Sequence, residues 1–179
     1  MRFNTFFVVL SAASALATPF KRDVATVKAD IAAISTQVTA LDTAITNYPN
    51  PGGTLAQALA IHNSAVALDN SVKKGTTDTQ ATAAFSEADG QSILASVQAL
   101  VPTIQHALQQ IVAKKPAFDA LPVGGIPALV LQDLRNLNTD TGAFADALIA
   151  KSPADLVTQA NQIKTTIANA FATAIAAYS

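Results

Sequence analysis

Residues 24–48 read VATVKADIAAISTQVTALDTAITNY, and this stretch decides the fold class. Its apolar residues and its tyrosine recur at alternating steps of three and four: Val24, Val27, Ile31, Ile34, Val38, Leu41, Ile45 and Tyr48. This spacing places all eight side chains on one stripe of an α-helix. We therefore predict a helix that buries one face and ends in the turn-forming run 47–53, NYPNPGG.

Four further stretches repeat the helical pattern. We expect a second helix at 54–74, ended by Gly75, and a third at 78–115, opened by a capping box at 77–80. A fourth is expected at 126–150, and a fifth from a cap at Ser152-Pro153 to the C-terminus. The third is the longest, and Pro102 predicts a kink between residues 98 and 102, because proline removes a helical hydrogen bond. Residues 116–127 are expected to form an apolar loop.

These elements predict an all-α protein, an antiparallel bundle of about five helices with one long, proline-kinked helix. An extended coiled coil is the alternative, since the first stripe also has a seven-residue spacing. The positions that flank this stripe lack the charge pairs that would specify a partner strand, so a bundle core is favoured.

The first residues carry a secretory pattern. A basic residue and a short apolar run precede Ala15-Leu16-Ala17, so residues 1–17 are predicted to be a signal peptide. The run is too short to span a bilayer. The dibasic pair Lys21-Arg22 predicts a second cut, which makes 18–22 a short pro-segment and 23–179 a single helical-bundle domain.

The composition points to a binding surface of low charge. Removing residues 1–22 takes away three basic residues and lowers the formal charge from −1 to −4, which argues against nucleic acid as a partner. Charged residues make up 13% of the chain, about half the usual share of ~25%.

The chain has no cysteine, so packing has to replace the disulfides of many secreted proteins. The C-terminus has no long apolar tail, so we expect no lipid anchor.

Groups that could perform catalysis are few. Without cysteine there is no thiol nucleophile and no thiolate metal site. His62 is expected at the edge of an apolar face and His106 in solvent, and neither belongs to a metalloprotease motif. We expect solvated helix faces for the acids Asp69, Asp78, Glu87, Asp89, Asp133, Asp140 and Asp146. The chain is therefore predicted not to be an enzyme and to need no cofactor or metal; a catalytic role would require His62, Glu87 or another single polar residue.

The apolar positions are more informative. Alanine-rich stripes leave room between helices, and a kinked helix beside small residues can leave a channel for an acyl chain. A solid core is the alternative. The candidate ligand-binding residues are Phe85, Val101, Ile104, Leu108, Phe118, Leu134, Leu137, Phe144, Leu148, Ile163, Ile167 and Phe171.

Several patterns occur in a characteristic order along the chain. They are Lys21-Arg22-Asp23, the helix ending at Tyr48, 114–118 (KKPAF), the series Leu134, Leu137, Phe144, Leu148 and Lys151-Ser152-Pro153, and 171–178 (FATAIAAY). In these features the chain resembles the fungal hydrophobic surface-binding protein A family, which includes cell-wall galactomannoproteins. The resemblance spans about residues 24–178.

The resemblance implies a helical bundle that binds hydrophobic material. Some members hold fatty acids in an apolar tunnel, and others adsorb to hydrophobic surfaces and recruit hydrolases there. We therefore expect a secreted, non-enzymatic binder of a fatty acid or similar lipid. The alternative is an interfacial or cell-wall protein that adsorbs to hydrophobic surfaces without a defined pocket.

Overall fold

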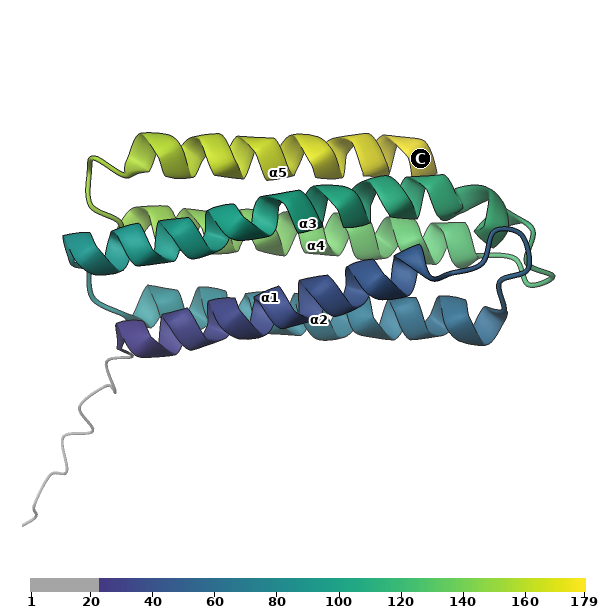
Figure 1. Cartoon of the computed structure of the whole chain (residues 1–179), viewed down its shortest axis with the longest axis horizontal. Coiled ribbons are helices and arrows are strands. Elements are labelled where there is room, and N and C mark those ends of the chain that lie inside the picture. The colour runs from purple at the N-terminus through teal and green to yellow at the C-terminus, as the bar shows by residue number, and fades with distance from the viewer. Residues whose placement is uncertain (1–22) are drawn as a thin grey trace, which may run out of the picture.

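The computed structural model describes residues 23–179, so the predicted signal peptide (1–17) and pro-segment (18–22) lie outside the described residues. Five helices follow one another: α1 Val24–Thr46, α2 Leu55–Ala81, α3 Glu87–Asp119, α4 Ile126–Lys151 and α5 Val157–Tyr178. Consecutive helices run in opposite directions (Figure 1). The predicted all-α bundle is confirmed. Among the helices of residues 23–179, none combines the length and the apolar character that a membrane span requires.

The helices pack as a closed ring. α1 packs on α2, α2 on α4, α4 on α5, α5 on α3, and α3 on α1, whereas α3 and α4 contact each other only weakly. Figure 1 shows three tiers, with α1 and α2 in one, α3 and α4 in the next, and α5 in the last. Because no helix runs through the centre of the ring, only side chains can fill it.

Local capping explains where the first two helices begin. The Thr26 backbone N–H donates to the Asp23 carboxylate at 2.9 Å, which caps α1. Thr54 and Gln57 form a reciprocal capping box at the start of α2. In α1 the predicted stripe is buried from Val27 onward and continues into the buried Tyr48, as the periodicity requires.

The predicted boundary between the second and third helices is wrong. α2 continues through Gly75 to Ala81, and the capping box expected at 77–80 lies inside it. Gly75 is an internal contact: a Cβ there would lie 3.1 Å from the Phe144 ring, so the missing side chain lets α4 pack close. α3 begins after Ser86, whose hydroxyl accepts the Asp89 N–H at 3.2 Å. It is the longest helix and, as expected, has Pro102 in its interior.

Two other predicted boundaries also move. The loop expected at 116–127 is shorter, because Pro116 and Phe118 belong to the last turn of α3. Ser152 does not cap α5; its hydroxyl donates to the Leu148 carbonyl at 2.8 Å at the end of α4. α5 begins later, behind Leu156, which supplies no side-chain cap.

Two lysines of α2 pair with aspartates that are largely buried. The Lys74 ammonium donates to Asp30 at 2.5 Å and to Asp78 at 2.7 Å, and these bonds raise the pKa of Lys74. Lys73 pairs in the same way with Asp69 of α2 and Asp140 of α4. Asp78 and Asp69 are only 2% and 7% exposed, so the expectation of solvated carboxylates is wrong for both. Their burial is tolerated because each has a cation beside it.

Candidate functional site

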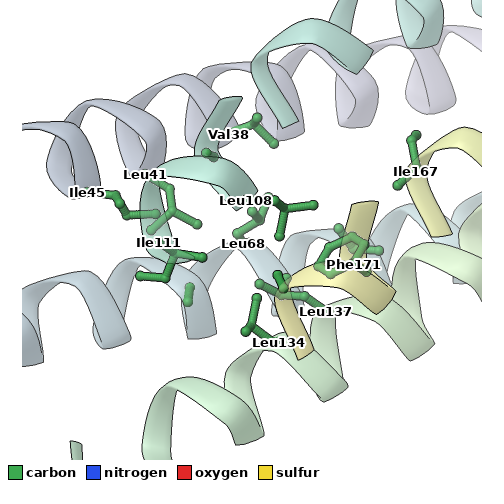
Figure 2. Close-up of a cluster of buried hydrophobic side chains, with 14 of the residues drawn as sticks. Val38, Leu41, Ile45, Leu68, Leu108, Ile111, Leu134, Leu137, Ile167 and Phe171 are labelled. Carbon is green, nitrogen blue, oxygen red and sulfur yellow. The ribbon is translucent and has the colours of Figure 1, made fainter. Parts of the chain in front are cut away.

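The centre of the ring contains an apolar cavity of about 160 Å³. All five helices contribute to its wall, and Figure 2 shows side chains from each of them gathered around the same region. An apolar cavity of ~150 Å³ can stay free of water, and it can bind a molecule the size of benzene. The ring therefore has a binding space at its centre and not a fully packed core.

Nine of the twelve predicted ligand-binding residues line this cavity: Ile104, Leu108, Leu134, Leu137, Phe144, Leu148, Ile163, Ile167 and Phe171. The other three lie elsewhere. Val101 is partly buried against the core. Phe118 stacks on Tyr48, with ring centroids 4.5 Å apart, and Phe85 is buried where its N–H donates to the Lys151 carbonyl at 2.8 Å. Ligand contact by any of the twelve stays a prediction.

The prediction missed the part of the wall that α1 and α2 provide. These residues are Ile31, Ile34, Val38, Leu41, Ile45, Ile61, Ala65, Leu68 and Val72. All nine are buried. The signal was present in the sequence, because the α1 residues belong to the stripe that identified the first helix.

The cavity reaches the surface on the side formed by α3, α4 and α5. Six apolar residues of the wall are partly exposed there: Leu94, Val97, Ala145, Ile149, Ala160 and Ile163. They come from the first half of α3, the second half of α4 and the first half of α5. Since these three segments lie at the same end of the bundle (Figure 1), we describe this region as the mouth of the cavity.

The wall also carries a few polar side chains: His62, Asp133, Thr141, Ser152 and Lys164. His62 Nδ1 lies 2.8 Å from Asp133 Oδ2, across the contact between α2 and α4. Burial raises the pKa of Asp133, and the bond to His62 partly offsets this shift. Both carboxylate oxygens of Asp133 lie within hydrogen-bonding distance of His62 Nδ1, Oδ2 at 2.8 Å and Oδ1 at 3.1 Å.

Lys164 lies at the mouth, on the first half of α5. Its ammonium donates to Asp146 Oδ1 of α4 at 2.5 Å. The Lys164 side chain is 34% exposed and that of Asp146 is 63% exposed, so this ion pair is accessible to solvent.

The second histidine, His106, pairs with an aspartate away from the cavity wall. His106 is exposed, as predicted, and its Nδ1 lies 2.6 Å from Asp42 of α1. Residues 23–179 contain no group of three His, Cys, Asp or Glu side chains that could hold a metal ion.

Comparisons with known proteins agree with this architecture. A family model described as hydrophobic surface binding protein A matches residues 24–150. Cell wall mannoprotein 1 of Aspergillus fumigatus is 31% identical over an alignment 189 residues long, gaps included. The alignment covers 99% of this chain. The chain spans 60% of the length of that relative.

Two solved structures share the fold. The crystal structure of Afmp4p in complex with palmitic acid is 33% identical, with a TM-score of 0.82, covering 88% of this chain and 100% of that one. Ligand binding domain 1 of the Penicillium marneffei MP1 protein, complexed with arachidonic acids, is 19% identical, with a TM-score of 0.78 and coverage of 87% and 99%. The match of the family model over residues 24–150 places the chain in the hydrophobic surface binding protein A family.

Proposed function

We propose that this protein is a secreted, non-enzymatic carrier that holds the alkyl chain of a long-chain fatty acid in its central cavity. The observation that carries the proposal is the apolar cavity enclosed by a ring of five helices, with a partly exposed apolar mouth. The similarity to Afmp4p, whose crystal structure contains palmitic acid, supports the choice of ligand. The predicted signal peptide and the similarity to cell wall mannoprotein 1 support export.

The size of the cavity has a consequence for binding. Sites for drug-sized ligands usually measure ~300–1,000 Å³, which is more than the 160 Å³ of this cavity. We expect the ring to widen on binding. The first half of α5 is the segment best suited to move, because residues 157–166 include no buried side chain.

A binding measurement tests the proposal. The purified chain is stripped of lipid and titrated with palmitate in a calorimeter, and the product is inspected by native mass spectrometry. We expect a saturable complex with at least one palmitate per chain. Absence of a complex in both measurements would overturn the proposal.

A pair of matched variants tests the location. Ala65 lies in the cavity wall and Ala67 is exposed on the same helix. Ala65→Leu should fill the cavity and weaken palmitate binding at least tenfold, since the added methyl groups occupy the ligand's space. Ala67→Leu should bind as the wild type does. Equal affinities for the two variants would show that the ligand binds elsewhere.

A second candidate function is adsorption to hydrophobic surfaces, which the family description favours. Leu59 and Val66 lie seven residues apart on α2 and are 39% and 41% exposed, so they share one outer face. Adsorption through this face should persist as salt is raised, because it does not depend on charge. Depletion of the protein onto apolar beads measures it. If Leu59→Ser with Val66→Ser leaves depletion unchanged, this face is not the adsorbing surface.

A further inference from the structure

The polar residues of the cavity wall lie at two different places along the bundle. His62 and Asp133 lie in the early turns of α2 and α4, at the end where these two helices begin. Lys164 lies in the early turns of α5, which begins at the opposite end (Figure 1). Asp133 is the partner of His62, and Asp146 is the partner of Lys164. Both aspartates belong to α4, where they are separated by about 20 Å of helix.

We propose that Lys164 binds the carboxylate of the bound fatty acid at the mouth, and that the alkyl chain extends from there toward the His62–Asp133 end. The proposal rests on the fatty-acid binding proposed above and assigns the orientation of the ligand. Lys164 is the lysine in the cavity wall, and it lies among the partly exposed apolar residues of the mouth.

The charges at the two ends favour this orientation over the reverse one. Asp133 would repel a carboxylate placed beside it, and the pKa of Asp133 is raised because burial already disfavours a negative charge there. A carboxylate at Lys164 would instead face a cation next to solvent. The buried wall residues between the two ends are apolar and suit an alkyl chain.

The present partner of Lys164 can be exchanged without leaving a charge unpaired. Asp146 is 63% exposed, so its carboxylate regains water when it releases the ammonium. The ligand carboxylate would take its place on Lys164. Asp146 is therefore a competitor for the same cation, which predicts opposite effects for substitutions of the two residues.

The test compares two ligands of equal chain length, decanoate and decan-1-ol, measured at neutral pH by displacement of a fluorescent fatty-acid probe. The wild type should prefer the acid about fivefold to tenfold, which is typical of a charge-assisted hydrogen bond near the surface. Lys164→Met should lose this preference while keeping its affinity for the alcohol. Lys164→Arg should keep the preference, because the positive charge is retained.

Two further variants serve as controls. Asp146→Asn removes the competitor and should bind decanoate about twofold to fivefold more tightly, with no change for the alcohol. Lys151→Met removes a positive charge from the same end of the bundle at a residue outside the cavity wall, and should leave both affinities unchanged.

Each outcome separates the orientation from the function itself. Retained preference for the acid in Lys164→Met would overturn the role of Lys164 and leave fatty-acid binding intact. An equal loss in Lys151→Met would show that net charge, and not the position of Lys164, sets the preference. If the wild type binds neither decanoate, decan-1-ol nor palmitate, both the orientation and the proposed function are wrong.

Discussion

The two halves of α5 differ in how they are held. The second half buries Ile167, Phe171, Ala174 and Tyr178. Its last turn is fixed further, because the Tyr178 hydroxyl donates to the Ile111 carbonyl of α3 at 2.7 Å. The first half, residues 157–166, has no buried side chain, and its start lacks a side-chain cap.

The difference shows that one helix can anchor the bundle at one end and cover the cavity at the other. Both halves carry the same apolar spacing in the sequence, from Ile163 through Ile167 to Phe171. What distinguishes them is the neighbouring structure: the second half packs on the end of α3, whereas the first half lies over the mouth. A segment with few buried contacts is the one that opens at the lowest free energy.

The largest expected effect comes from breaking the anchored half. Phe171→Ala should lower the free energy of unfolding by about 3–5 kcal/mol, because it removes a buried ring and enlarges the cavity. Ile163→Ala, in the covering half, should cost about 1 kcal/mol, since that side chain is already partly exposed. Urea unfolding of both variants measures the difference. Equal losses would mean that the two halves are equally anchored.

Hydrogen exchange should resolve the two halves in the unmodified protein. The free energy of the openings that expose the amides of residues 161–166 should be about 2 kcal/mol lower than that of the openings that expose the amides of residues 171–176. Saturation with palmitate should slow the first group more than the second, because the proposed ligand lies beneath the first half. Uniform protection along α5, with and without palmitate, would contradict both the comparison and the proposed movement.

The two tyrosines provide a finer test. Tyr178→Phe should cost about 1 kcal/mol, because it removes the bond that ties α5 to α3. Tyr48→Phe should be neutral or slightly stabilising, since the buried Tyr48 hydroxyl has no hydrogen-bond partner among the described residues. Thermal unfolding of the two variants gives the comparison. A larger loss for Tyr48→Phe would reverse the assignment.

The smallest effect should appear at alkaline pH. Burial raises the pKa of Tyr178 above its ordinary value of 10.0, so the folded state keeps this proton after the unfolded state has lost it. Stability from this group is complete below pH 10 and declines as the pH rises further, by less than ~1 kcal/mol at pH ~10.5. Tyr178→Phe should therefore lose less stability than the wild type between pH ~9.5 and ~10.5. Parallel curves would show that Tyr178 ionises as freely in the folded protein.

Local periodicity was sufficient to predict the helices but not their ends. The stripe beginning at Val24 needs no information beyond its own neighbours, which is why that helix was predicted closely. Gly75 resembles a helix terminator until Phe144, 69 residues later, is known to pack against it. Sequence alone could not distinguish a terminating glycine from one that permits close packing.

The site was predictable in composition but not in arrangement. Most of the predicted apolar residues line the cavity, because a core stripe and a cavity wall have the same spacing. The two polar pairs at the cavity could not be predicted from the sequence. His62 and Asp133 are 71 residues apart, and Lys164 of α5 contacts Asp146 of α4. Their proximity depends on the order of helices in the ring, which no local pattern encodes.

The odd number of helices in the ring also leaves one helix macrodipole uncompensated. α1, α3 and α5 begin at one end of the bundle, where only α2 and α4 finish (Figure 1). Opposed dipoles cancel in pairs, so that end retains a positive excess of about half an elementary charge, and the other end an equal negative excess. The positive pole is the end at which Lys164 lies. The backbone itself therefore adds a weak field that draws an anion toward the mouth and away from Asp133.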